Sequence, residues 1–174
     1  VHYPDFEDLV AEIRQSGIRV LTYFNPMLVQ EEENPESSSY TYAESMGYLV
    51  KNKKGKTYTI GLGGLNAAML DITNPEAKNW IKSLIKQHVD IGVSGWLAYF
   101  GETIPYDAVL HNGADASKYH NQYVDDWVQL NREVIEETDL EGEGLFMSRS
   151  GILKTPGKAM SFWIGDQNVT WDKH

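Results

Sequence analysis

Two short apolar runs in this 174-residue chain end in polar residues that are suited to chemistry. The first run reads GWLAYFGE and spans Gly95 to Glu102, and the second reads WIGDQN and spans Trp163 to Asn168. In parallel α/β folds, the residues that follow the carboxyl ends of the strands build the site. The second run presents a carboxylate, Asp166, and the first presents a phenol, Tyr99. We therefore expect both runs at the same rim of a parallel sheet.

Hydrophobic periodicity predicts the elements that must position these residues. Apolar residues at helical spacing predict three helices, and short runs rich in β-branched and aromatic residues predict strands. The helices are expected within residues 4–17, 75–92 and 117–138, and the strands at 18–24, 68–72, 95–100, 145–147 and 161–164. Strands that alternate with amphipathic helices are typical of a parallel sheet, so the predicted fold class is α/β.

The stretch between the first two strands predicts an excursion from this pattern. Residues 30–39 are acidic and rich in serine and are expected to form an exposed loop, and residues 42–46 are expected to form one helical turn. The apolar stretches 48–50 and 58–60 flank a turn signal at Asn52–Gly55, which predicts a small β-hairpin.

Composition excludes several classes of function. The formal net charge of −10 argues against nucleic acid and against an anionic membrane surface as partners. The chain has no cysteine, which excludes disulfides and thiolate metal sites, and no window is apolar enough to span a membrane. His88, His111 and His120 match no zinc spacing. We expect neither a metal nor a cofactor, and the compartment stays open.

Six segments resemble glycoside hydrolase family thirty-one, the retaining α-glucosidase family, and most closely its bacterial sulfoquinovosidase branch. They follow the order of the family and span nearly the whole chain. The segments are Tyr23–Pro26, Leu70–Ala77, Gly95–Glu102, Leu110–Gly113, Met147–Arg149 and Trp163–Val169.

The resemblance implies a (β/α)8 TIM barrel of which residues 1–174 form a partial catalytic domain, with the middle strands only. An open arc of barrel exposes two edge strands and part of the core. We therefore expect the rest of the barrel to be required, either in cis or from another chain.

The resemblance also implies roles for individual residues. Asp166 takes the place of the acid/base, while Tyr99 stands where the family has its nucleophilic aspartate. Asp71, Arg149 and Trp163 take places that line or contact the sugar. Gln167, beside the acid/base, is expected to bind substrate as well.

Tyr99 is the departure from the family that matters for catalysis. Retaining hydrolysis uses two carboxyl groups about 5–5.5 Å apart. A phenol with a pKa of about 10 is a poor nucleophile unless a base lies beside it. Glu102 is a candidate for that base. Its alternative role is that of a turn residue whose carboxylate accepts hydrogen bonds from backbone amides.

The sequence thus leaves three functions open. The first is a retaining α-glycoside hydrolase of the α-glucosidase or sulfoquinovosidase kind, impaired by Tyr99. The second is a catalytically silent relative that binds carbohydrate, and the third is a purely structural part of a barrel. In the first two functions the ligand is an α-glycoside.

Overall fold

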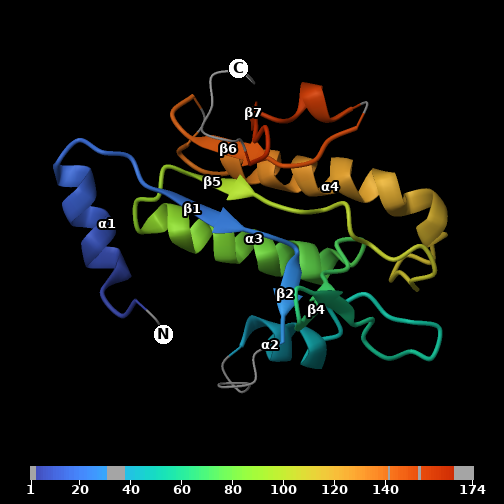
Figure 1. Cartoon of the computed structure of the whole chain (residues 1–174). Coiled ribbons are helices and arrows are strands. Elements are labelled where there is room, and N and C mark those ends of the chain that lie inside the picture. The colour runs from blue at the N-terminus through green and yellow to red at the C-terminus, as the bar shows by residue number, and fades with distance from the viewer. Residues whose placement is uncertain (1–2, 31–37, 141, 153, 167–174) are drawn as a thin grey trace.

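A computed structural model describes residues 3–30, 38–140, 142–152 and 154–166. Its central layer is a four-stranded parallel sheet with the order β1-β5-β6-β7 (Figure 1). The strands span Leu21–Phe24 (β1), Gly95–Ala98 (β5), Leu145–Ser148 (β6) and Ser161–Phe162 (β7). Neighbouring strands are joined by helical connections, as parallel pairing requires. This arrangement confirms the predicted part of a (β/α) barrel.

The helices α3 (Pro75–Asp90) and α4 (Ala116–Glu136) cover one face of this sheet (Figure 1). The other helices are α1 (Phe6–Gln15), the short α2 (Ser39–Ser45), which packs against a second sheet, and the 3-10 helix η2 (Thr155–Gly157). The start of α3 follows its local sequence, because the Asn74 side chain accepts a hydrogen bond from Glu76 N at 3.0 Å and Pro75 occupies the first turn. The buried Trp96 of β5 donates from Nε1 to Asn131 Oδ1 of α4 at 2.7 Å, which fixes α4 to the sheet.

The opposite face of the sheet is uncovered. Side chains alternate along each strand, so Phe24, Trp96 and Phe146 point toward the helices while their neighbours point away. On the outward face Leu21 is 46% exposed and Tyr23 is 50% exposed. The described strands therefore form an open arc and not a closed barrel, as predicted.

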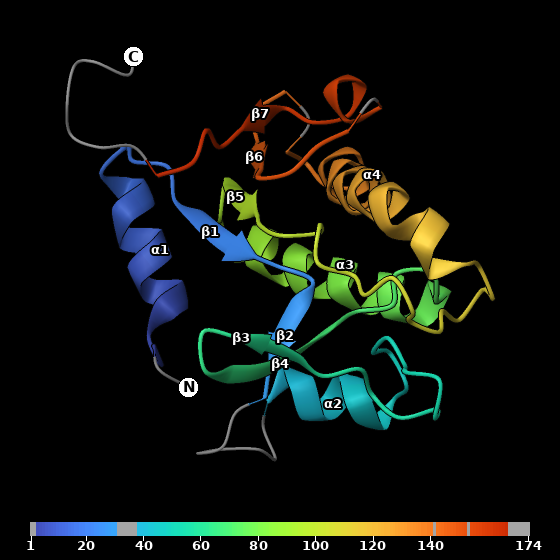
Figure 2. The same ribbon diagram turned by 45° about the vertical axis from the view of Figure 1, so that its right-hand side comes forward.

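The predicted strand at 68–72 is not part of the parallel sheet. The observed strand, β4 (Leu65–Met69), lies in a separate antiparallel sheet of order β2-β4-β3, with β2 at Met27–Val29 and β3 at Ile60–Leu62 (Figure 2). Gly63 and Gly64, with φ of 56° and 93°, form the two-residue turn between β3 and β4. Periodicity does not report strand direction, which explains the error.

The predicted small hairpin is present. Lys51 and Thr57 form an antiparallel bridge, and Tyr58 N donates to Val50 O at 2.8 Å. The turn is held by Asn52 Oδ1, which accepts from Lys54 N and Lys56 N. The acidic stretch expected at 30–39 falls mostly outside the described residues.

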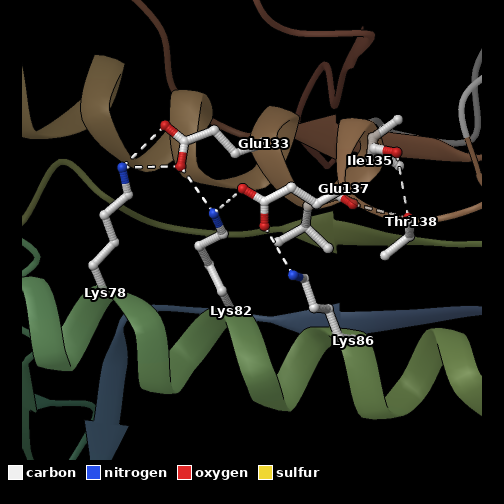
Figure 3. A network of polar contacts seen from close by, with 8 residues as sticks. Lys78, Lys82, Lys86, Glu133, Ile135, Glu137 and Thr138 are labelled. Carbon is white, nitrogen blue, oxygen red and sulfur yellow. Dashed lines mark hydrogen bonds and ion pairs between the residues drawn. The ribbon is translucent and has the colours of Figure 1, made fainter.

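A ladder of ion pairs joins α3 to α4 (Figure 3). Lys78, Lys82 and Lys86 recur at four-residue spacing on α3 and face Glu133 and Glu137 of α4. The Lys82 ammonium bridges the two carboxylates, at 3.1 Å from Glu133 Oε2 and 2.5 Å from Glu137 Oε1, and its side chain is only 11% exposed. Burial alone would lower the pKa of Lys82, but its hydrogen bonds to the two glutamates outweigh burial and raise that pKa.

Lys82→Met tests the central rung of this ladder. We expect a loss of about 1–3 kcal/mol in the free energy of unfolding, because a half-buried charge cluster loses its shared cation. Urea denaturation measures the loss. The matched control is Arg132→Met, which breaks the more exposed pair Arg132–Glu136 within α4 and should cost about 0.5 kcal/mol or less. Equal losses in the two variants would contradict this assignment.

His88 makes the stability of the fold depend on pH. Its ring packs against Phe6 of α1 at 5.7 Å and Phe24 of β1 at 4.8 Å between centroids. Its buried Nδ1 has no hydrogen-bond partner among the described residues, and burial lowers the pKa of His88. With a folded pKa below the unfolded value of about 6.5, the unfolded state binds more protons as the pH falls.

We therefore expect the free energy of unfolding to decrease as the pH is lowered below about 6.5. Denaturation curves recorded at pH 7.5 and pH 5.5 measure this decrease. His88→Leu should make the decrease smaller, while the exposed His111→Gln should leave it unchanged. An unchanged pH dependence in His88→Leu contradicts the role of His88.

Candidate functional site

Three of the predicted site residues meet at the carboxyl ends of neighbouring strands. Tyr99 follows β5, Arg149 follows β6 and Trp163 follows β7. The rings of Tyr99 and Trp163 are 5.2 Å apart between centroids. The guanidinium carbon of Arg149 lies 4.5 Å from the centre of the Tyr99 ring and 5.9 Å from that of Trp163. We call these three residues the rim cluster.

Strand register explains why the rim cluster forms. Leu97, Met147 and Ser161 are aligned across β5, β6 and β7. Each member of the rim cluster lies two residues further along its strand, so it shares the outward face with these three. The backbone ladder continues to this level, since Tyr99 N donates to Phe24 O at 2.8 Å and Trp163 N donates to Ser148 O at 2.9 Å.

Aromatic rings surround Tyr99. Its centroid lies 5.3 Å from Tyr23 of β1 and 4.7 Å from Phe100. Arg149 also lies over Phe100, at 4.5 Å from the ring centre. A guanidinium at this distance from aromatic faces is held by cation–π attraction. The Tyr99 ring thus forms part of a packed aromatic and guanidinium stack.

Glu102 holds Arg149 from the other side. Glu102 Oε1 accepts from Arg149 Nε at 2.8 Å, and Oε2 accepts from Ser150 Oγ at 2.7 Å. The Ser150 hydroxyl also lies 3.0 Å from Phe100 O. Both carboxylate oxygens of Glu102 therefore have partners other than Tyr99. Sequence reasoning missed Ser150, because a serine after a strand carries no signal by itself.

The backbone between Tyr99 and Glu102 reverses direction. Phe100 has a φ of 54° and Gly101 a φ of 111°, both in the left-handed region. A Cβ on Gly101 would lie 3.2 Å from Trp127 Cδ1 of α4, so the loop passes close to the helix. This turn brings Glu102 back toward the end of β6.

Asp71 is buried and bonded through both of its oxygens. Oδ1 accepts from Thr73 N at 3.1 Å and from Thr73 Oγ1 at 2.5 Å, and Oδ2 accepts from His111 N at 2.7 Å. Asp71 follows β4 and therefore does not stand at the end of a parallel strand. It ties the start of α3 to the loop between β5 and α4, and its place on the sugar wall stays a prediction.

The acid/base candidate lies on the segment that follows β7. Asp166 is exposed and comes three residues after Trp163. Gln167 lies outside the described residues.

Among the described residues, no group of three or more His, Asp or Glu side chains is placed to hold a metal ion. Within the same part of the chain, no helix is both long enough and apolar enough to cross a membrane.

Asp71→Asn tests the anchoring role of Asp71. An amide nitrogen cannot accept the bonds that one carboxylate oxygen receives, so we expect a loss of about 1–3 kcal/mol in the free energy of unfolding. The matched control is Asp107→Asn, since the exposed Asp107 accepts one bond from Tyr58 Oη at 2.8 Å. Chemical denaturation measures both variants, and a loss in Asp71→Asn no larger than in the control contradicts the anchoring role.

Comparison with known proteins identifies the relatives of this chain. Residues 1–174 match the model of the glycosyl hydrolases family 31 TIM-barrel domain. The chain is 36% identical over 171 residues to a sulfoquinovosidase of Escherichia coli, and the aligned region covers 98% of this chain and 24% of that protein. It is 36% identical over 174 residues to a sulfoquinovosidase of Agrobacterium fabrum, and that aligned region covers 99% of this chain and 26% of the relative.

A solved structure agrees with these matches. The chain superposes on a sulfoquinovosidase of the same family from E. rectale, in complex with an aza-sugar inhibitor, with a TM-score of 0.86 and 32% identity. The match covers 95% of this chain and 24% of that one. The chain thus spans about a quarter of the length of these relatives. With a family model that matches all 174 residues, the chain belongs to glycosyl hydrolase family 31, within its TIM-barrel domain.

Proposed function

We propose that this chain forms the central part of the barrel of a sulfoquinovosidase-like α-glycosidase whose hydrolytic step is impaired by Tyr99. The similarity to sulfoquinovosidases over nearly the whole chain supports the substrate class. The rim cluster supports the location of the site, because its side chains come from the ends of three different strands.

The proposed roles follow from the chemistry of retaining hydrolysis. Asp166 would donate a proton to the glycosidic oxygen and later take a proton from water. Arg149 would contact the sugar through its free guanidinium N–H groups, and Trp163 would form an aromatic wall. The step without a suitable group is the attack on the anomeric carbon, which in this mechanism forms a glycosyl ester with a second carboxylate.

The observation that carries the proposal is the environment of Tyr99. Its phenol needs an adjacent base to act as a nucleophile near neutral pH. The candidate that the sequence offers, Glu102, is bonded to Arg149 and Ser150. Arg149 stacks on the Tyr99 ring. Because this ring is much larger than an aspartate side chain, it would fill space that a short carboxylate would leave to the sugar. The arrangement favours binding over turnover.

A second function is a catalytically silent relative that binds carbohydrate. The observation that favours it is the same stack, since aromatic faces and a guanidinium are suited to sugar rings and hydroxyls. Sugar binding without release of an aglycone distinguishes this function from impaired hydrolysis.

We also propose that the site needs the rest of a barrel, in cis or from another chain. The outward face of the sheet supports this, since apolar Leu21 and Leu145 are exposed on it. The proposed ligand is an α-glycoside. No nucleic acid, membrane or cofactor is part of the proposal.

Tyr99→Asp should restore hydrolysis in a protein that carries the complete barrel. We expect the rate to rise by several orders of magnitude, about 10⁴–10⁶-fold, the scale on which deletion of a catalytic group acts in other hydrolases. Release of p-nitrophenol from the α-glucoside and the α-sulfoquinovoside measures the rate. Asp166→Asn in the same background should abolish the gain.

Tyr23→Asp is the matched control, because the Tyr23 ring contacts Tyr99 but Tyr23 does not occupy the position of the nucleophile. It should give no gain. Turnover by the unchanged protein at about 1–10³ s⁻¹, the usual range for enzymes, would contradict the proposal.

A further inference from the structure

We infer that Glu102 is a positioning residue that aims the guanidinium of Arg149 into the sugar site. This inference rests on the proposed function, because it assigns to Arg149 the contact with the sugar. Glu102 lies on the loop after β5 and Arg149 at the end of β6, so their ion pair joins two strand ends at the rim.

The geometry fixes the direction of the guanidinium. Glu102 Oε1 accepts a hydrogen bond from Arg149 Nε at 2.8 Å, while the guanidinium carbon lies 4.5 Å from the ring centres of Tyr99 and Phe100. One edge of the guanidinium is thus bonded and its plane is packed against rings. Four N–H donors on the two terminal nitrogens remain for a ligand. Without Glu102 a long, half-exposed arginine would populate several rotamers.

The backbone is built to deliver Glu102 to this place. Phe100 and Gly101 occupy the left-handed region, which residues other than glycine rarely adopt. The reversal turns Glu102 toward β6, where Ser150 bonds to its second oxygen at 2.7 Å. Such strain is retained where the surrounding structure needs the conformation.

A role as general base for Tyr99 does not fit these contacts. A base must reach the proton that it abstracts within about 2.6–3.2 Å, and the oxygens of Glu102 are bonded to Arg149 and Ser150. A role in merely holding the loop after Arg149 does not fit either. That loop has a second anchor, because the Thr155 hydroxyl bonds to the buried carboxylate of Asp125 and accepts from Ile152 N at 2.9 Å.

The test is a double-mutant cycle on sugar affinity in the protein with the complete barrel. Glu102→Gln, Arg149→Met and the double variant are titrated with sulfoquinovose and with glucose in a calorimeter. We expect Glu102→Gln to weaken binding about 10-fold, and to have no further effect once Arg149 is replaced. Additive effects of the two changes overturn the inference, because Glu102 would then act independently of Arg149.

Two controls separate positioning from a general loss of structure. Thermal unfolding should show little change in Glu102→Gln. Glu136→Gln, which breaks the ion pair with Arg132 on α4, should leave affinity unchanged. A loss of affinity in Glu102→Gln that follows a comparable loss of folded protein overturns the inference.

A spectroscopic measurement tests the pairing of Glu102 with Arg149 independently of sugar binding. The Nε–H signal of Arg149 in ¹⁵N-arginine spectra should be protected from solvent exchange, and Glu102→Gln should remove that protection. If the unchanged protein binds neither sugar, the proposed function fails while this signal still reports the pairing. If the protection persists in Glu102→Gln, the positioning role fails, whatever the sugar affinity.

Discussion

The close parallel pairing of β5 with β6 is the constraint on which the site depends. Gly95 makes it possible, because a Cβ at this position would lie 2.0 Å from Leu145 O, far inside any real contact. With the strands this close, Leu97 is aligned with Met147, and the same register places Tyr99 beside Arg149 at the rim. A slip of one residue would send one of these side chains to the helical face. The backbone pairing of the strands therefore determines which side chains meet in the rim cluster.

The helical layer stabilises that pairing from one side only. Trp96 reaches from β5 to Asn131 of α4, and the lysine–glutamate ladder joins α4 to α3. The apolar side chains of α3 and α4 and the lysines and glutamates of the ladder lie at different positions around the same helices. Both sets of contacts can therefore form together. The result is a packed helical layer behind the site and an open face in front of it. The relatives, which are about four times as long, have further chain with which to cover such a face.

The rim cluster combines two kinds of interaction around Arg149, an ion pair and a stack on aromatic rings. A carboxylate at position 99 would be a natural partner for Arg149, as Glu102 is now. The phenol offers instead a large aromatic face, and Arg149 lies over it at 4.5 Å. Cation–π attraction of this kind is worth about 0.5–2 kcal/mol, enough to bias the position of a side chain. Neither the phenol nor the guanidinium is a carboxylate that could form a glycosyl ester. The stack is thus compatible with the sugar recognition that we propose, and under that proposal hydrolysis is the step for which it lacks a group.

Local sequence determined the helices, the caps and the residues at the strand ends. The spacing of apolar residues gave α1, α3 and α4 to within a few residues, and the motifs around Tyr99, Arg149 and Trp163 indicated the family and one common rim. These features are readable because they depend on neighbours three or four residues away, or on a motif as a whole.

Only the tertiary structure decided the partners of β4, Asp71 and Glu102. A short apolar strand pairs in either direction, and β4 joined an antiparallel sheet. Asp71 bonds a backbone amide 40 residues away, and Glu102 pairs with an arginine near the end of a strand that folds beside it. A carboxylate on a turn has the same local pattern whether it serves as a base, a backbone cap or the partner of a distant cation. The choice among these roles belongs to long-range packing, which brings the partner into reach.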